Sequence, residues 1–121
     1  MKIPGPDHPI TITSNPRRVR VTVAGRTIAD SRAVLTLREA SYPPVQYVPR
    51  GDVDMSALAR TERKTQCPYK GEASYYSIVP AGERGANAVW TYETPNPSVA
   101  SIKEHLAFYP DRVDRIEEVD D

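Results

Sequence analysis

The residues best suited to chemistry lie in one short segment, Cys67 to Gly71, with the sequence C-P-Y-K-G. Pro68 fixes its own φ and restricts the residue before it, while Gly71 adopts backbone conformations closed to other residues. The segment therefore predicts a tight, rigid turn, in which Cys67 and Lys70 can face one cavity. A nearby ammonium favours the thiolate, which is the nucleophilic form of cysteine. Cys67 and Lys70 are accordingly the candidate catalytic residues.

Both residues also have a purely structural interpretation. Lone cysteines are among the most buried residues and commonly act as small hydrophobic side chains, which is the more frequent role. Lys70 can equally be solvated, or can pair with Glu39 or Glu72. The sequence leaves both interpretations of Cys67 and of Lys70 open.

Aromatic residues gather on two expected strands further along the chain. Tyr75 and Tyr76 precede a glycine-bearing loop, and Trp90 and Tyr92, which follow it, share one face of a strand. Such side chains usually form core, but their N–H and O–H groups can also line an apolar cavity. Single-stranded nucleic acid is usually bound by aromatic residues in a positively charged groove, but only Arg84 adds positive charge near these four residues. They are therefore a poor match for a nucleic-acid site. Tyr75, Trp90 and Tyr92 are therefore candidate ligand-binding residues for an unknown small molecule.

The few possible metal ligands do not suggest a metal centre. The chain has two histidines and one cysteine, with no C-x-x-C pair. His8 falls in an expected tail, and His105 falls at an expected helix end, where a histidine is favoured as a cap. Three protein ligands would therefore have to converge by chance. We expect neither a metal nor a cofactor.

Hydrophobic periodicity and twelve prolines predict short strands and turns rather than long helices. The clearest strand is 18–23, where Val19, Val21 and Val23 alternate with polar residues. Glu39 continues the apolar face of the strand 33–39 and should point inward. The other expected strands are 27–30, 46–48, 74–80, 88–92, 106–109 and 112–116. Two short helices are expected, one capped by Asp52 or Asp54 and ending near Arg63, the other starting at Asn96-Pro97 and including Leu106.

Length and charge restrict the class of protein. A chain of 121 residues fits one domain, and 16 Lys plus Arg balance 16 Asp plus Glu, which disfavours nucleic-acid and anionic-membrane partners. No apolar run approaches the roughly 20 residues that span a bilayer. The single cysteine and the polar start predict a soluble cytoplasmic protein. The expected organisation is a tail at 1–7, one domain at 8–116 and an acidic tail at 117–121, with a homodimer through edge strands as an open possibility.

Several uncommon segments occur together and in order along the chain. They are His8–Ile10 (H-P-I), Gly25–Ser31 (G-R-T-I-A-D-S), Tyr47–Val53 (Y-V-P-R-G-D-V), Cys67–Gly71 (C-P-Y-K-G), Asn87–Tyr92 (N-A-V-W-T-Y) and Ala107–Pro110 (A-F-Y-P). Together they resemble the domain of unknown function 427 family from about His8 to Ile116. Ala24 departs from the family pattern, where a second glycine is common, and this affects only the turn type.

The resemblance implies a mainly β fold of bacterial type, with twisted antiparallel sheets in a small tent-like or barrel-like arrangement and two short helices. The tent-like form also occurs in methionine sulfoxide reductase B. That enzyme's chemistry is not expected here, because such reductases usually need a second, resolving cysteine. A nucleotidyl-transfer label sometimes attached to the family would need Mg²⁺-binding carboxylates, which only Asp52 and Asp54 could supply.

Polar residues near these segments form a second candidate ligand-binding set. Its members are Glu39, Tyr47, Arg50 and Asp52. An inward Glu39 must be paired or protonated, and Arg20, Arg50 or Lys70 are its possible partners. Such a pair is either a structural ion pair or the acid/base of a site. Asp52 is equally suited to capping a helix.

Three hypotheses for function follow from these residues. The first is an enzyme that uses Cys67 and Lys70, and the second is a binding or sensor module that uses the same cavity without turnover. The third is an interaction domain whose apparent pocket is only core. We favour a small-molecule pocket around the C-P-Y-K-G segment, with turnover left open and nucleotidyl transfer as a weaker alternative.

Overall fold

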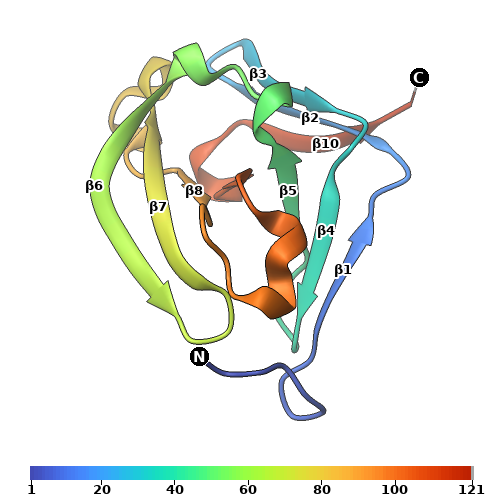
Figure 1. The fold of residues 1–121 in the computed structure, drawn as a ribbon. Coiled ribbons are helices and arrows are strands. Elements are labelled where there is room, and N and C mark those ends of the chain that lie inside the picture. Colours follow the sequence, from blue (N-terminus) through green and yellow to red (C-terminus); the bar gives the residue numbers. More distant parts are fainter. Residues whose placement is uncertain (121) are drawn as a thin grey trace.

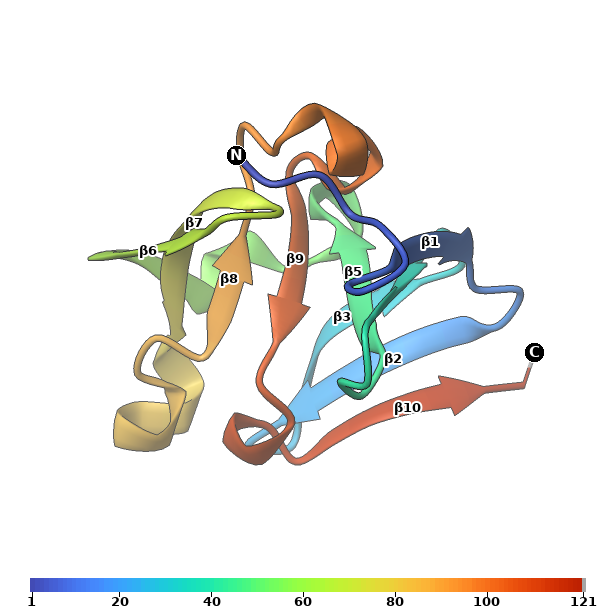
Figure 2. The ribbon, with the colours of Figure 1, turned by 90° about the horizontal axis from the view of Figure 1, so that it is seen from below.

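A computed structural model describes residues 1–120, and these form a mainly β structure with two antiparallel sheets that do not close into a barrel. The predicted fold class is therefore confirmed. The large sheet has the strand order β1 (Ile10–Ser14), β4 (Leu35–Glu39), β5 (Val45–Pro49), β9 (His105–Phe108), β8 (Val89–Thr91), β7 (Gly71–Ile78) and β6 (Leu58–Cys67). The small sheet has the order β10 (Arg115–Val119), β2 (Arg18–Val23) and β3 (Arg26–Ser31) (Figures 1 and 2).

The β2–β3 hairpin follows directly from its sequence. Val19, Val21 and Val23 are all buried, as the alternation predicts. Ala24 and Gly25 both have positive φ, at 52° and 73°, the conformation of a two-residue hairpin turn whose twist matches that of the strands. The backbone N–H of Ala24 donates to the carboxylate of Asp114, which helps to hold a non-glycine residue in this conformation.

The large sheet buries a different cluster on each face. Val48 and Tyr76 belong to the cluster between the two sheets, which we call the aliphatic core. Their neighbours Tyr47 and Tyr75 belong to the cluster on the opposite face, which we call the aromatic cluster. Successive side chains of a strand point to opposite faces, so one strand supplies both clusters. The segment Pro97–Ile102 covers the aromatic cluster (Figure 1).

All helical segments in residues 1–120 are 3₁₀ turns. They are η1 (Arg50–Asp52), η2 (Met55–Ala57), η3 (Val79–Gly85), η4 (Pro97–Ile102) and η5 (Pro110–Arg112). Both expected helices coincide with such turns but are shorter than expected. Asp54 does cap η2, accepting the N–H of Ser56, yet β6 begins at Leu58 and runs to Cys67. Pairing with β7 outweighs the helical spacing of the apolar residues there.

The second helix and the chain ends also differ from expectation. η4 ends at Ile102, so His105 is the first residue of β9 rather than a helix cap, and its ring nitrogen contacts the carbonyl of Lys103. The expected strand 112–116 is instead β10, which starts at Arg115 and includes Glu117–Val119 of the expected tail. Asp121 lies outside the described residues. No helix in residues 1–120 is long and apolar enough to cross a membrane.

Candidate functional site

A cavity of about 210 Å³ opens on the aromatic side of the large sheet. Six residues predicted from the sequence line it, namely Glu39, Tyr47, Lys70, Tyr75, Trp90 and Tyr92. The remaining lining residues are Leu37, Tyr42, Pro43, Val45 and Tyr109. Side chains from β4, β5, β7 and β8 and from the β6–β7 turn thus converge on one space, which we call the aromatic cavity.

The C-P-Y-K-G segment forms the turn between β6 and β7, where Cys67 pairs with Gly71. Gly71 has a φ of 109°, and a Cβ there would lie 3.3 Å from Oδ1 of Asn96. Asn96 also donates its backbone N–H to the carbonyl of Lys70 at 2.9 Å, and its side-chain amide to the carbonyl of Pro68 at 3.2 Å. These contacts fix the turn and direct Lys70 to the cavity wall.

Lys70 and Glu39 form an ion pair in this wall. The ammonium of Lys70 donates to Oε1 of Glu39, and the two side chains are only 12% and 13% exposed. The other carboxylate oxygen of Glu39 lies 2.6 Å from Nε2 of His8. Desolvation raises the pKa of Glu39, but the hydrogen bonds from Lys70 and His8 outweigh it, so the pKa lies below its ordinary value. Glu39 is therefore a carboxylate at neutral pH.

His8 is the site residue that sequence reasoning missed. Its ring stacks on that of Tyr69, with centroids 4.0 Å apart and planes 5° from parallel. A stacked ring whose nitrogen contacts Glu39 is not part of a free tail. The available signal was the position of His8 at the start of the first family-like segment, His8–Ile10, which placed it at the edge of the domain and not in the tail.

The aromatic side chains of the cavity are linked to one another. Nε1 of Trp90 donates to the hydroxyl of Tyr47 at 3.2 Å, and the Trp90 ring lies 4.5 Å from that of Tyr109. Burial raises the pKa of Tyr47 and of Tyr92, and it raises that of Tyr109 to about 12. These phenols are neutral at physiological pH, so they offer hydrogen bonds rather than negative charge.

Cys67 lies beside the cavity but is absent from its wall. It is half-buried and packs against the aromatic cluster. Burial is the main cause of the raised pKa of Tyr92, and the neighbouring Tyr47 and Cys67 add to it. The thiol therefore packs against the same cluster that supplies the cavity wall, but it does not line the cavity itself.

Arg50 and Asp52 are not brought together with the other candidate residues. Arg50 donates to the hydroxyl of Tyr76, on the aliphatic side of the sheet, at 3.0 Å. Asp52 accepts the hydroxyl of Ser31 at 2.6 Å. Asp54 binds Arg26 at 2.5 Å and caps η2, so the two aspartates do not form a shared cation site. No group of three or more His, Cys, Asp or Glu in residues 1–120 is placed to hold a metal ion.

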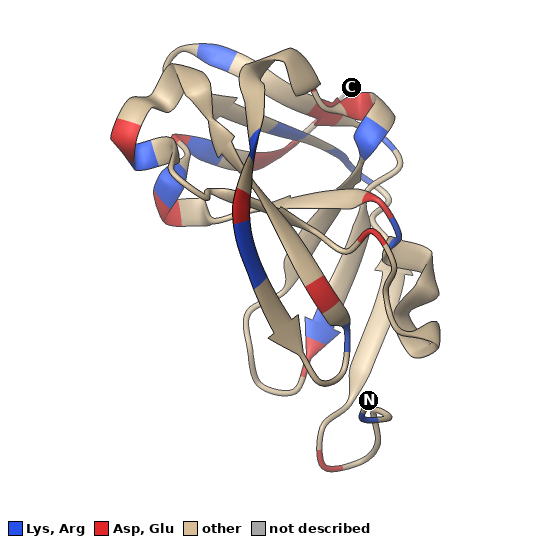
Figure 3. Cartoon of the chain, turned by 60° about the vertical axis from the view of Figure 1, so that its left-hand side comes forward, with Lys and Arg blue, Asp and Glu red and all other residues tan. Residues whose placement is uncertain are grey.

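Charge on the surface is mixed. Basic and acidic residues are both spread along the chain, and several lie close to one another in the cartoon of Figure 3. Many are paired, as in the two hydrogen bonds of 2.8 and 2.9 Å between Arg60 and Glu93. The hydrogen bonds of Arg60 are the main cause that lowers the pKa of Glu93 to about 2. This pairing leaves the carboxylates ionised and their charge locally balanced.

The fold and the cavity together define a small mainly β domain with an aromatic pocket that has an ion pair in its wall. Residues 11–119 match the family model described as domain of unknown function (DUF427). Because the match spans nearly the whole chain, the protein belongs to this family, as the sequence segments indicated. None of the curated proteins matches the chain.

Proposed function

We propose that the domain binds a small planar molecule with an amide-like edge in the aromatic cavity. The observation that carries this proposal is the nearly buried Lys70–Glu39 pair in the wall of a cavity otherwise formed largely by aromatic side chains. A binding site typically combines mainly apolar walls with a few placed polar groups. The cavity combines aromatic side chains with placed polar groups, and its lining is about as polar as it is apolar.

The ion pair has hydrogen-bonding capacity beyond its internal contacts. A carboxylate accepts about four hydrogen bonds, and Glu39 receives one from Lys70 and contacts His8 once. An ammonium has three donors, one of which goes to Glu39. A ligand group that presents an N–H donor beside a C=O acceptor complements this pair. Amides, ureas and the edges of heteroaromatic rings have that pattern.

The aromatic walls favour a flat ligand. Trp90, Tyr47 and Tyr92 offer ring faces and edges, which pack well against another ring. A volume of about 210 Å³ corresponds to about seven liquid-water molecules. This size suits a single substituted ring. The neutral phenols add hydrogen bonds without adding charge.

The test is a titration of the single tryptophan's fluorescence with benzamide, nicotinamide and the non-planar cyclohexanecarboxamide, checked by calorimetry. We expect saturable binding of the planar amides, at least tenfold weaker binding of the third probe, and at least tenfold loss for Lys70→Met. The matched control is Lys64→Met, because Lys64 also pairs with a glutamate but is 50% exposed. Absence of binding by all probes, or equal affinity in both variants, would contradict the proposal.

A second candidate function is turnover with Cys67 as the nucleophile. It is favoured by the packing of Cys67 against the aromatic cluster that supplies the cavity wall. The test is the rate of Cys67 alkylation by iodoacetamide between pH 5 and 10. A reactive thiol whose apparent pKa rises in Lys70→Met would support catalysis. Protection of Cys67 until the protein unfolds would limit it to a structural role.

Other aspects of function are proposals without a specific contact to support them. A cytoplasmic location, the absence of a nucleic-acid partner and a homodimer through edge strands rest on sequence arguments alone. Nucleotidyl transfer gains no support from Asp52 and Asp54, which bind Ser31 and Arg26 respectively. Sedimentation analysis would test the homodimer, and localisation of the tagged protein would test the cytoplasmic location.

A further inference from the structure

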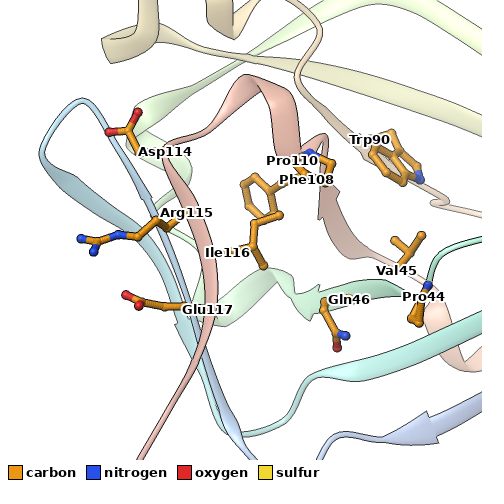
Figure 4. Close-up of a pocket in the computed structure, with 10 residues that line it drawn as sticks. All are labelled: Pro44, Val45, Gln46, Trp90, Phe108, Pro110, Asp114, Arg115, Ile116 and Glu117. Carbon is orange, nitrogen blue, oxygen red and sulfur yellow. The ribbon is translucent and has the colours of Figure 1, made fainter.

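A larger groove adjoins the aromatic cavity. It has a volume of about 630 Å³, and its apolar wall is formed by Pro44, Val45, Trp90, Phe108, Pro110 and Ile116 (Figure 4). Charged residues of β10 also border it, but Figure 4 shows the charged ends of Arg115 and Glu117 pointing away from Phe108 and Ile116. The groove is therefore mainly apolar, with Gln46 as a polar residue of its lining and charged residues at its rim.

The groove exists because two strands of the large sheet separate. β5 and β9 pair only at Val48 with Leu106 and at Pro49 with His105. Beyond these pairs, Val45 lies opposite β4 and Phe108 lies opposite β8, so the two strand ends have no ladder between them. The groove is bordered here by residues of both clusters, Val45 and Trp90 from the aromatic cluster and Phe108 from the aliphatic core.

Shared residues connect the groove to the cavity. Val45 and Trp90 line both spaces. Trp90 directs its ring N–H to Tyr47 on the cavity side, and Figure 4 shows this nitrogen turned away from Phe108. The same indole thus forms the boundary of a polar space and of an apolar one.

We propose that the two spaces form one bipartite site, in which the cavity holds the polar ring of a ligand and the groove holds an apolar substituent of the same molecule. This inference rests on the proposed function of the cavity. It assigns the ligand to a class, that of amphipathic molecules with an amide-edged ring and a short hydrocarbon or aryl arm. The shared lining residues Val45 and Trp90, which place the groove directly beside the cavity, are the reason to assign both spaces to the same ligand.

The experiment compares the affinities of benzamide and of 3- and 4-butylbenzamide for the full chain by calorimetry and tryptophan fluorescence. Burial of a butyl group in the groove should make the better of the two butyl compounds bind at least tenfold more tightly than benzamide. In Ile116→Thr, this gain should fall at least threefold while the affinity of benzamide stays unchanged.

The matched control is Val119→Thr, in the same strand but outside the groove, which should change neither affinity. If circular dichroism shows that Ile116→Thr is unfolded, Pro44→Ser replaces it, with the same expected result. Benzamide binding without a butyl gain would overturn the bipartite site and leave the cavity proposal standing. Failure of benzamide itself would overturn both. A dimer by sedimentation, combined with no butyl gain, would assign the groove to a second copy of the chain and overturn the inference.

Discussion

The two faces of the seven-stranded sheet are supplied by alternate residues of the same strands, yet they differ in chemistry. On the face toward the small sheet, aliphatic side chains such as Ile78 pack against residues of the small sheet such as Val21, and both of these are completely buried. The opposite face carries Tyr47, Tyr92 and the Lys70–Glu39 pair around an open cavity. The aliphatic core therefore supplies stability, whereas the aromatic side holds polar groups at its centre, where a ligand can reach them.

The largest expected effect is on the aliphatic core. Ile78→Ala removes a fully buried side chain and should lower the free energy of unfolding by about 2–5 kcal/mol. Its neighbour Val79 is 61% exposed, so Val79→Ala should cost less than about 0.5 kcal/mol. Urea denaturation measures both. A similar small cost for the two variants would show that the face between the sheets is not tightly packed.

The next effect is on the ion pair of the aromatic cavity. Lys70→Met leaves the Glu39 carboxylate with His8 as its remaining partner, and should cost about 1–3 kcal/mol of stability. Lys64→Met breaks an exposed pair and should cost no more than about 1 kcal/mol. Thermal and urea denaturation compare the two. A Lys70→Met variant as stable as the wild type would mean that the pair contributes nothing to the fold.

A smaller effect is expected from a single hydroxyl. Tyr47→Phe removes the acceptor of the Trp90 N–H while keeping the ring in place, and should cost about 1 kcal/mol. Tyr42→Phe, at a side chain that is 64% exposed, should have no measurable effect. The fluorescence maximum of Trp90 should shift in the first variant and remain fixed in the second. Identical spectra would contradict the Trp90–Tyr47 contact.

The smallest effect concerns pH. Hydrogen bonds from Lys70 and His8 outweigh desolvation and lower the pKa of folded Glu39 from its ordinary 4.5. The stability that ionised Glu39 contributes is thus fully present above pH 4.5 and is lost as pH falls through the folded-state value. The stability difference between wild type and Glu39→Gln should therefore shrink below pH 4.5, as urea midpoints between pH 3 and 7 would show. A constant difference would contradict the lowered pKa.

The parts of the fold set by local pattern were predictable. The alternation of Val19, Val21 and Val23 gave β2 with its correct bounds, and the C-P-Y-K-G segment was correctly expected to turn. The stretch 58–63 was expected to be helical because its apolar spacing fits a helix, but its conformation is decided by pairing with β7, which is a non-local interaction.

The site was predictable where a residue type had only a few possible roles. An inward Glu39 needs a cation, and Lys70 was one of the partners considered. The contact of His8 with Glu39 joins residues 31 positions apart, so no local pattern indicates it. Arg50 and Asp52 were grouped with Tyr47 because all three lie in the family-like segment Tyr47–Val53, yet β5 ends at Pro49 and the 3₁₀ turn η1 takes both away from the cavity.

The most direct test of the contrast between the two faces is a two-dimensional ¹H–¹⁵N NMR titration with benzamide. Saturable shifts are expected at the backbone amides of Glu39, Lys70 and Tyr47 and at the indole N–H of Trp90, with the amides of Val21 and Ile78 unchanged. Shifts confined to the aliphatic side, or no saturable shift at the Trp90 indole, would contradict the claim that the aromatic cavity is the binding face.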